Sequence, residues 1–127
     1  MANNEIRWTD VPRKKDFESA RAFLTLTLPE DAVDRVVARL SQAPTIRHQP
    51  KDLERASGMK LLPPDDPVVS SKPRRSRKGR PLSPVLLVRG RLDRDRSLVI
   101  ADGFHRICAS YHVNRKALIP CRLVDLD

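Results

Sequence analysis

The sequence is poor in glycine, cysteine and aromatic residues, and each shortage excludes a class of protein. Its 127 residues include 4 glycines, 2 cysteines and 4% aromatic residues, which excludes a collagen-like chain and a disulfide-rich secreted scaffold. No apolar run approaches the roughly 18 residues of a membrane-spanning helix. The first ten residues also lack the basic and then apolar layout of a signal peptide. We therefore expect a small cytoplasmic protein without a membrane partner.

The two cysteines do not indicate a metal centre. Cys108 and Cys121 form no CxxC pair, and no histidine lies at zinc-finger spacing from them. We predict two small core residues and no metal ligands.

The length fits a single domain, because domains cluster near about 100–150 residues. The first fourteen residues are polar and basic, with Trp8 as their main apolar anchor. Such a segment predicts a loosely ordered N-terminal arm over residues 1–14. The remainder, residues 15–127, is predicted to form one domain.

Apolar residues at helical spacing predict three helices in the first half of the chain. The first covers residues 17–24, although a strand-like alternation over residues 24–28 competes with its end. The second begins at Pro29 and ends before Pro44, and the third runs from residue 50 to a glycine cap at residue 58. The proline-rich stretch over residues 61–67 is predicted to be a turn or linker.

The last third of the chain predicts strands around one helix. Buried-strand patterns occupy residues 84–90 and 97–101, a helical pattern follows at 104–113, and residues 119–126 form a third strand pattern. We predict an α+β fold, in which this β-β-α-β core forms a small mixed sheet and the N-terminal helices pack on it. The last strand is expected to pair in parallel with residues 97–101, although the connection is short for that arrangement.

The excess of positive charge is concentrated in one segment. The chain has a formal net charge of +9, and residues 72–80 contain six basic residues and no acidic one. Pro73 and Gly79 interrupt a helical pattern and like charges repel, so we predict a flexible basic loop. Its basic residues are Lys72, Arg74, Arg75, Arg77, Lys78 and Arg80. Clustered cations of this kind bind nucleic acid by releasing counterions, but a solvated loop without a partner fits the same composition equally well.

A second feature, Asp-Gly-Phe-His-Arg at residues 102–106, lies where a predicted strand meets a predicted helix. The N–H groups of a helix N-terminus bind anions. Gly103 has no Cβ to keep an anion from the backbone, and His105 and Arg106 add side-chain donors. We therefore predict a phosphate or nucleotide site at Gly103, Phe104, His105 and Arg106. In the alternative interpretation Asp102 is a simple N-cap and the two cationic side chains are solvated.

The segment around this turn resembles the ParB/sulfiredoxin-like superfamily. The likeness covers about Leu82 to Val124 and rests on PVLLVRG, LVIADGFHRICASYH and IPCRLV. Members of the superfamily share a strand, a second strand that ends in a Gly-x-His/Arg-Arg signature at a helix start, and an Ile-Pro strand. The resemblance implies a ParB/sulfiredoxin-like domain whose signature holds the phosphates of a nucleotide such as ATP, ADP or CTP, with Mg²⁺.

Departures from the superfamily pattern make some of the superfamily's activities unexpected for this sequence. Phe104 stands where sulfiredoxins have their catalytic cysteine, so sulfiredoxin chemistry is not expected. Chromosome-partitioning ParB proteins continue into a helix-turn-helix, whereas this sequence ends at Asp127, and we expect no full DNA-sliding clamp. The Asp-Gly-x-His-Arg form is most similar to members related to free-serine kinases and to small ParB-like proteins. That similarity implies a carboxylate that activates a hydroxyl group, for which Asp102 is the nearby candidate. His105, which can exchange a proton near neutral pH, is the second candidate catalytic residue.

Three functions remain open at this point. The first is nucleotide binding at residues 102–106, with phosphotransferase or phosphoesterase activity if the protein is an enzyme. The second is a nucleic-acid-binding accessory protein or nuclease that uses residues 72–80. The third is a non-catalytic regulatory protein whose phosphate site has decayed. The sequence does not indicate the oligomeric state or a second substrate.

Overall fold

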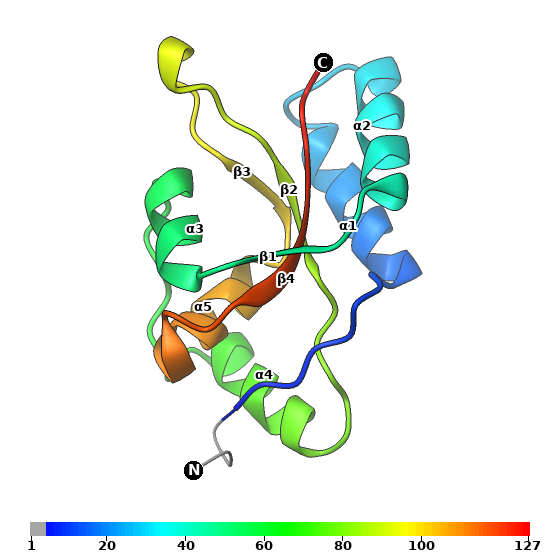
Figure 1. Cartoon of the computed structure of the whole chain (residues 1–127). Coiled ribbons are helices and arrows are strands. Elements are labelled where there is room, and N and C mark those ends of the chain that lie inside the picture. The colour runs from blue at the N-terminus through cyan, green and yellow to red at the C-terminus, as the bar shows by residue number, and fades with distance from the viewer. Residues whose placement is uncertain (1–4) are drawn as a thin grey trace.

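The computed structural model describes residues 5–127 and shows an α+β architecture with five α-helices and a four-stranded mixed sheet (Figure 1). The helices are α1 (Lys14–Leu24), α2 (Glu30–Gln42), α3 (Pro50–Ser57), α4 (Pro67–Arg77) and α5 (Phe104–Asn114). The strands are β1 (Ile46–His48), β2 (Val85–Val88), β3 (Val99–Asp102) and β4 (Ile119–Val124). Within residues 5–127, no helix is long and apolar enough to cross a bilayer.

The predictions for α1, α2, α3 and α5 are confirmed, and local signals account for their ends. The backbone N–H of Arg13 donates to Asp16 Oδ2 at 2.7 Å, which closes a capping box at the start of α1. Pro29 precedes α2, whose apolar stripe is buried. Gly58 ends α3 in the left-handed conformation, with φ of 67°.

The sheet has the order β1-β4-β2-β3, and this order corrects one prediction. The last strand, β4, pairs in parallel with β2 and not with β3. The reason is the antiparallel β2–β3 hairpin. It places the last residue of β3 at the same end of the sheet as the first residues of β2 and β4. The short connection through α5 therefore only has to cross over the first residues of β2 to reach the start of β4. It does not have to run back along the length of the sheet. The short edge strand β1, antiparallel to β4, was not predicted.

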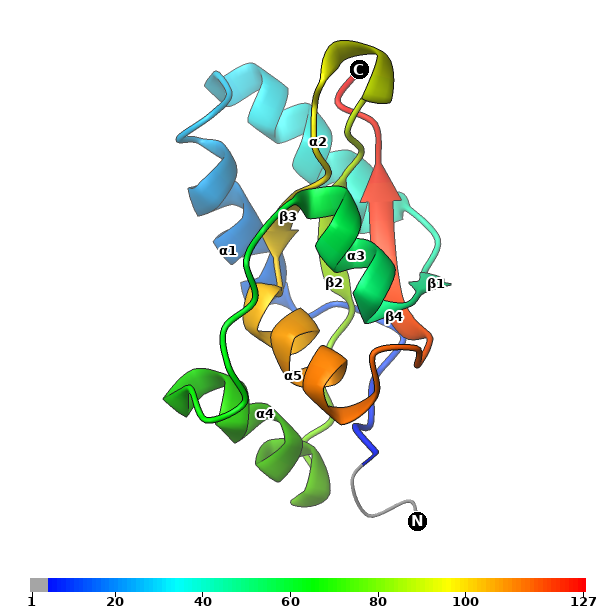
Figure 2. The same cartoon turned by 90° about the vertical axis from the view of Figure 1, so that its left-hand side faces the viewer.

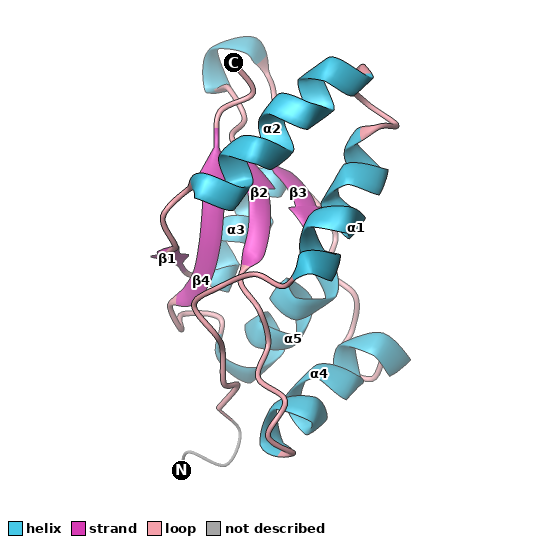
Figure 3. Ribbon diagram, turned by 90° about the vertical axis from the view of Figure 1, so that its right-hand side faces the viewer, coloured by secondary structure: helices cyan, strands magenta, loops and turns pink. Residues whose placement is uncertain are grey.

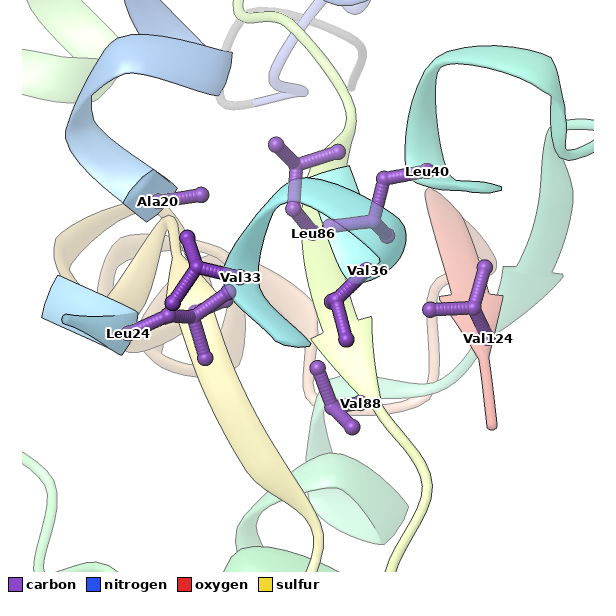
Figure 4. Packing of buried hydrophobic residues seen from close by; sticks show 9 residues of the cluster. Ala20, Leu24, Val33, Val36, Leu40, Leu86, Val88 and Val124 are labelled. Carbon is purple, nitrogen blue, oxygen red and sulfur yellow. The ribbon is translucent and has the colours of Figure 1, made fainter. Parts of the chain in front are cut away.

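Helices cover both faces of the sheet, and β2 runs between two apolar clusters. Helices α3 and α5 lie in front of the sheet in Figure 2, and α1 and α2 cover the other face in Figure 3. Leu86 and Val88 point toward α1 and α2, where Val36 packs against them (Figure 4). Val85 and Leu87 belong to the cluster on the α3 and α5 side. Because all four residues of β2 are buried, the strand shows no alternation of apolar and polar residues.

The prediction of a flexible loop over residues 72–80 is wrong for its larger part. Residues 72–77 are the second half of α4, and only residues 78–80 form a turn. The helix forms despite Pro73 because Asp66 caps its start, accepting from the N–H groups of Val68 and Val69 at 3.0 Å each. The helix also packs against α5, and its buried Ser76 Oγ accepts a hydrogen bond from the Arg7 N–H at 2.6 Å. Tertiary contacts thus outweigh the backbone hydrogen bond that Pro73 cannot donate.

The described part of the predicted N-terminal arm contacts the rest of the domain through backbone hydrogen bonds and the side chain of Ile6. The N–H of Thr9 donates to the Leu82 carbonyl at 2.8 Å, and the N–H of Leu82 donates to the Arg7 carbonyl at 2.9 Å. Ile6 is buried against α4 and α5. Residues 5–13 therefore contact the rest of the domain at these points, and residues 1–4 lie outside the described residues.

Candidate functional site

A cavity of about 370 Å³ opens where the N-terminal ends of α1 and α5 meet the inner side of α4. It joins the two features that were separate in the sequence, because residues from the basic segment 72–80 and from the turn 102–106 line the same space. The lining residues are Arg13, Lys15, Asp16, Ser19, Lys72, Arg75, Leu82, Ser83, Asp102, Gly103, Phe104, His105 and Arg106.

Helix α4 divides the six cations of the basic segment between two sides. Lys72 and Arg75, one turn apart, are half-buried and line the cavity. The other four are exposed and do not line it: Arg74, Arg77, Lys78 and Arg80. None of the six forms an ion pair with another residue among 5–127. The fold therefore supplies these cations with no carboxylate of their own.

The cavity is strongly positive. Five Lys or Arg residues and two Asp residues line it, so its formal net charge is +3. The electrostatic effect is visible at Lys72, where burial and the charges of Arg75, Arg106 and Lys15 lower the pKa of the ammonium group. Asp102 opposes this shift without reversing it. Such a cavity favours an anionic ligand.

Arg106 is held by the protein and is not a free phosphate donor. Its side chain is 9% exposed, and Nη1 donates to both the carbonyl and the Oγ of Ser83 at 2.6 Å. Nη2 donates to Asp102 Oδ2 at 2.5 Å and lies 3.5 Å from Asp16 Oδ1. The guanidinium thus connects the start of α5 to β3, to α1 and to Ser83, two residues before β2. We interpret Arg106 as a positioning residue.

Asp102 lies in the cavity wall but is not the N-cap of α5. The N-cap is Gly103, and no side chain caps this helix. Burial raises the pKa of the Asp102 carboxyl, and the nearby charge of Asp16 raises it further, while Arg106 and a hydrogen bond from Ser19 oppose the shift. The carboxylate is therefore already engaged by neighbouring side chains.

Packing against Val85 requires a glycine at position 103. Its φ is 108°, which is left-handed, and a Cβ at this position would lie 2.5 Å from Val85 Cγ1. Val85 therefore fills the space that the missing side chain leaves, and Gly103 itself lines the cavity. The next two residues remain at the cavity, where the half-buried rings of Phe104 and His105 meet edge to face at 5.7 Å.

The sequence reasoning missed the cavity wall that α1 supplies. Arg13, Lys15, Asp16 and Ser19 are more than eighty positions from the turn at 102–106, and only packing brings them there. One local signal existed, because Asp16 stands three residues after Arg13 in a capping-box position. In the structure Asp16 is only 5% exposed and belongs to a buried charged cluster. The three-residue spacing between Arg13 and Asp16 does not indicate this burial.

The residues described here do not form a metal-binding cluster of their own. Among residues 5–127, no three His, Cys, Asp or Glu side chains are placed to hold a metal ion together. Both cysteines are buried thiols, and burial raises the pKa of Cys121 to about 12.

Comparison of the chain with protein-family models, with curated proteins and with solved structures finds no match in any of the three. The function is accordingly argued from the geometry of the cavity.

Proposed function

We propose that the cavity binds a phosphorylated small molecule, and that a nucleotide polyphosphate is its ligand. The observation that carries the proposal is the convergence of unpaired cations from α1 and α4 on the uncapped N-terminus of α5. A helix N-terminus and clustered Lys and Arg side chains both favour a phosphate, and here they face one space.

The residues proposed to contact phosphate differ from those that the sequence alone suggested. Lys15, Lys72 and Arg75 are the side chains that contact phosphate, because no carboxylate within residues 5–127 forms an ion pair with them. The backbone N–H groups of Phe104 and His105, in the first turn of α5, are the further donors. Arg106 holds this turn in place and acts indirectly.

The resemblance of residues 82–124 to the ParB/sulfiredoxin-like superfamily supports the same ligand, because members of that superfamily hold nucleotide phosphates at the corresponding signature. We include a ParB/sulfiredoxin-like fold in the proposal on this basis. Any phosphoryl transfer or ester hydrolysis would depend on Asp102 and His105, which line the cavity. Binding does not depend on turnover, so the two are tested separately.

The test of binding is a thermal-shift series with ATP, ADP and CTP in the presence of Mg²⁺ at low salt. A ligand at a hundred times its Kd stabilises the native state by about 2.7 kcal/mol, which raises the Tm by several degrees. We expect Lys72→Ala and Arg75→Ala each to remove most of this rise. The matched controls are Arg74→Ala and Arg77→Ala, since both residues are on α4 but outside the cavity. An equal loss in the controls, or no loss at Arg75, contradicts the assignment.

A second function is favoured by the four exposed cations of α4 and its turn. Because they lack partners among residues 5–127, they suit a nucleic-acid backbone as an alternative ligand. This hypothesis predicts oligonucleotide binding that weakens steeply with salt, and a slope that falls by about 2 in the double variant Arg74→Ala/Arg77→Ala. If neither nucleotides nor oligonucleotides bind, the third hypothesis, a regulatory protein with a decayed site, is favoured.

A further inference from the structure

We propose that Lys72 is a nucleophilic amine in the cavity, where it forms an imine with the carbonyl carbon of a phosphorylated aldehyde or ketone. That the ligand carries a phosphate follows from the proposed function above. That Lys72 is the nucleophile is inferred from the surroundings of Lys72 itself.

Lys72 differs from every other lysine of the chain in burial and pairing. The others are Lys14, Lys15, Lys51, Lys60, Lys78 and Lys116. Five of these six are exposed, and the half-buried Lys51 forms an ion pair with Asp52 at 3.1 Å. Lys72 alone is half-buried, lines a cavity and forms no ion pair within residues 5–127. It lies on the inner side of α4, between the buried residues Val69 and Ser76.

Charges from each neighbouring element act on this amine. Burial disfavours the ammonium form, and Arg75 on α4, Arg106 on α5 and Lys15 on α1 repel it, so the pKa of Lys72 is lowered. Asp102 at the end of β3 is the one opposing charge among these groups, and Arg106 already binds it. A larger neutral fraction makes a lysine a better nucleophile, and a neighbouring cationic group is a known way to obtain it.

The reaction needs no redox partner. The neutral Nζ attacks the carbonyl carbon, a C–N bond forms, and the carbonyl π electrons move to oxygen, which takes a proton. The nitrogen then gives up one proton, which leaves a carbinolamine with a free lone pair on nitrogen. A second proton is added to the hydroxyl group, the lone pair expels it as water, and the C–O bond breaks. The resulting iminium releases its remaining N–H proton to give the neutral imine, with a double bond from nitrogen to carbon. Amine and carbonyl are thus converted to imine and water. His105 and Asp102 line the same cavity and are the side chains that can pass these protons.

The ligand's phosphate has a defined place in this arrangement. Arg75 stands one turn from Lys72 on α4, so a phosphate bound by Arg75 and Lys15 holds the carbonyl within reach of Nζ. The negative phosphate favours the ammonium form of Lys72, but the cations that bind it offset this charge. Holding the reactants together also raises the rate of imine formation.

The experiment uses pyridoxal 5′-phosphate as the probe on the full chain, followed by borohydride reduction and peptide mapping by mass spectrometry. We expect the reduced adduct mainly on Lys72, at roughly ten times the level of any exposed lysine. Lys72→Arg should remove it, and Arg75→Ala should reduce it severalfold. The control Lys78→Arg, in the same basic segment, should leave it unchanged. Circular dichroism checks that the variants fold. Adducts spread evenly over the lysines overturn the proposal.

Pyridoxal without phosphate separates this inference from the proposed function. Preferential labelling of Lys72 by pyridoxal, together with no thermal shift from nucleotides, supports the nucleophile and contradicts the phosphate site. A thermal shift from nucleotides without labelling of Lys72 by either aldehyde supports the phosphate site and overturns the nucleophile.

Discussion

Two arginine-rich regions lie at opposite ends of the molecule, α4 with its turn at one end and the tip of the β2–β3 hairpin at the other (Figure 1). In the hairpin, Arg89 pairs with Asp125 and Arg91 with Asp93, each at 2.7 Å. In the basic segment 72–80, no cation pairs with any residue among 5–127. Both regions are basic in sequence, but among residues 5–127 two of the four arginines of the hairpin, Arg89 and Arg91, have a carboxylate partner, whereas none of the six cations of the basic segment has one.

The difference is the reason for placing the proposed anion site by the location of carboxylates rather than by the number of cations. Exposed cations with acidic neighbours are partly neutralised and gain little from a ligand. The cations at α4 have no acidic partner among residues 5–127, and two of them border a cavity. The net charge of +9 is therefore informative only after it is divided between these regions.

The largest expected effect concerns Arg106, which is the ion-paired arginine of the cavity. Replacing it by alanine leaves Asp102 and Asp16 facing each other in a buried site. Removing one partner of a buried ion pair costs about 3–5 kcal/mol, and we expect a loss of that size for Arg106→Ala in urea denaturation. A loss below about 1 kcal/mol would show that water already screens this cluster.

The second prediction compares two glycines at the cavity end. Gly103 and Gly79 both have positive φ, at 108° and 80°, but a Cβ would collide with Val85 only at Gly103. Gly79→Ala should therefore cost only the backbone penalty of about 1–2 kcal/mol. Gly103→Ala should cost about 1–3 kcal/mol more, because overpacking is added. Equal free energies of unfolding for the two variants would contradict the packing role of Gly103.

The third prediction uses pH. Burial raises the pKa of Asp102 above its ordinary value of 3.8, so the native state binds this proton more tightly than the unfolded state does. The stability that this group contributes is fully present below pH 3.8 and is lost as the pH rises from there through the native pKa. Asp102→Asn should flatten this fall in the free energy of unfolding, measured by urea denaturation at several pH values. The slope is compared, because the variant also loses its ion pair with Arg106. An unchanged slope would assign the pH dependence to other groups.

Much of the fold could be predicted because its signals are local. The cap at Gly58, the proline before α2 and the apolar run of β2 each identify an element from neighbouring residues alone. The errors arose where distant contacts decide. Residues 72–77 are helical because α5 and Arg7 hold α4, and β4 joins β2 because the hairpin reverses β3.

The candidate site divides in the same way. The turn at 102–106 was correctly predicted at a junction of strand and helix, since both flanking patterns are local. The role of Arg106 was not predictable, because its partners Ser83 and Asp16 come from other segments. For the same reason, the sequence could not show that Lys72 and Arg75 face this turn while Arg74 and Arg77 face solvent.

The smallest expected change in the free energy of unfolding concerns the hairpin, the second of the two regions compared. Arg89 and Asp125 are 59% and 65% exposed, so their ion pair is screened by water. Arg89→Ala should change the free energy of unfolding by less than about 1 kcal/mol, and less still in 0.5 M NaCl, where charges are screened within about 4 Å. The thermal shift produced by nucleotides should stay the same in this variant. If Arg89→Ala weakens that shift as much as Arg75→Ala does, binding follows overall charge, and the cavity has no privileged role.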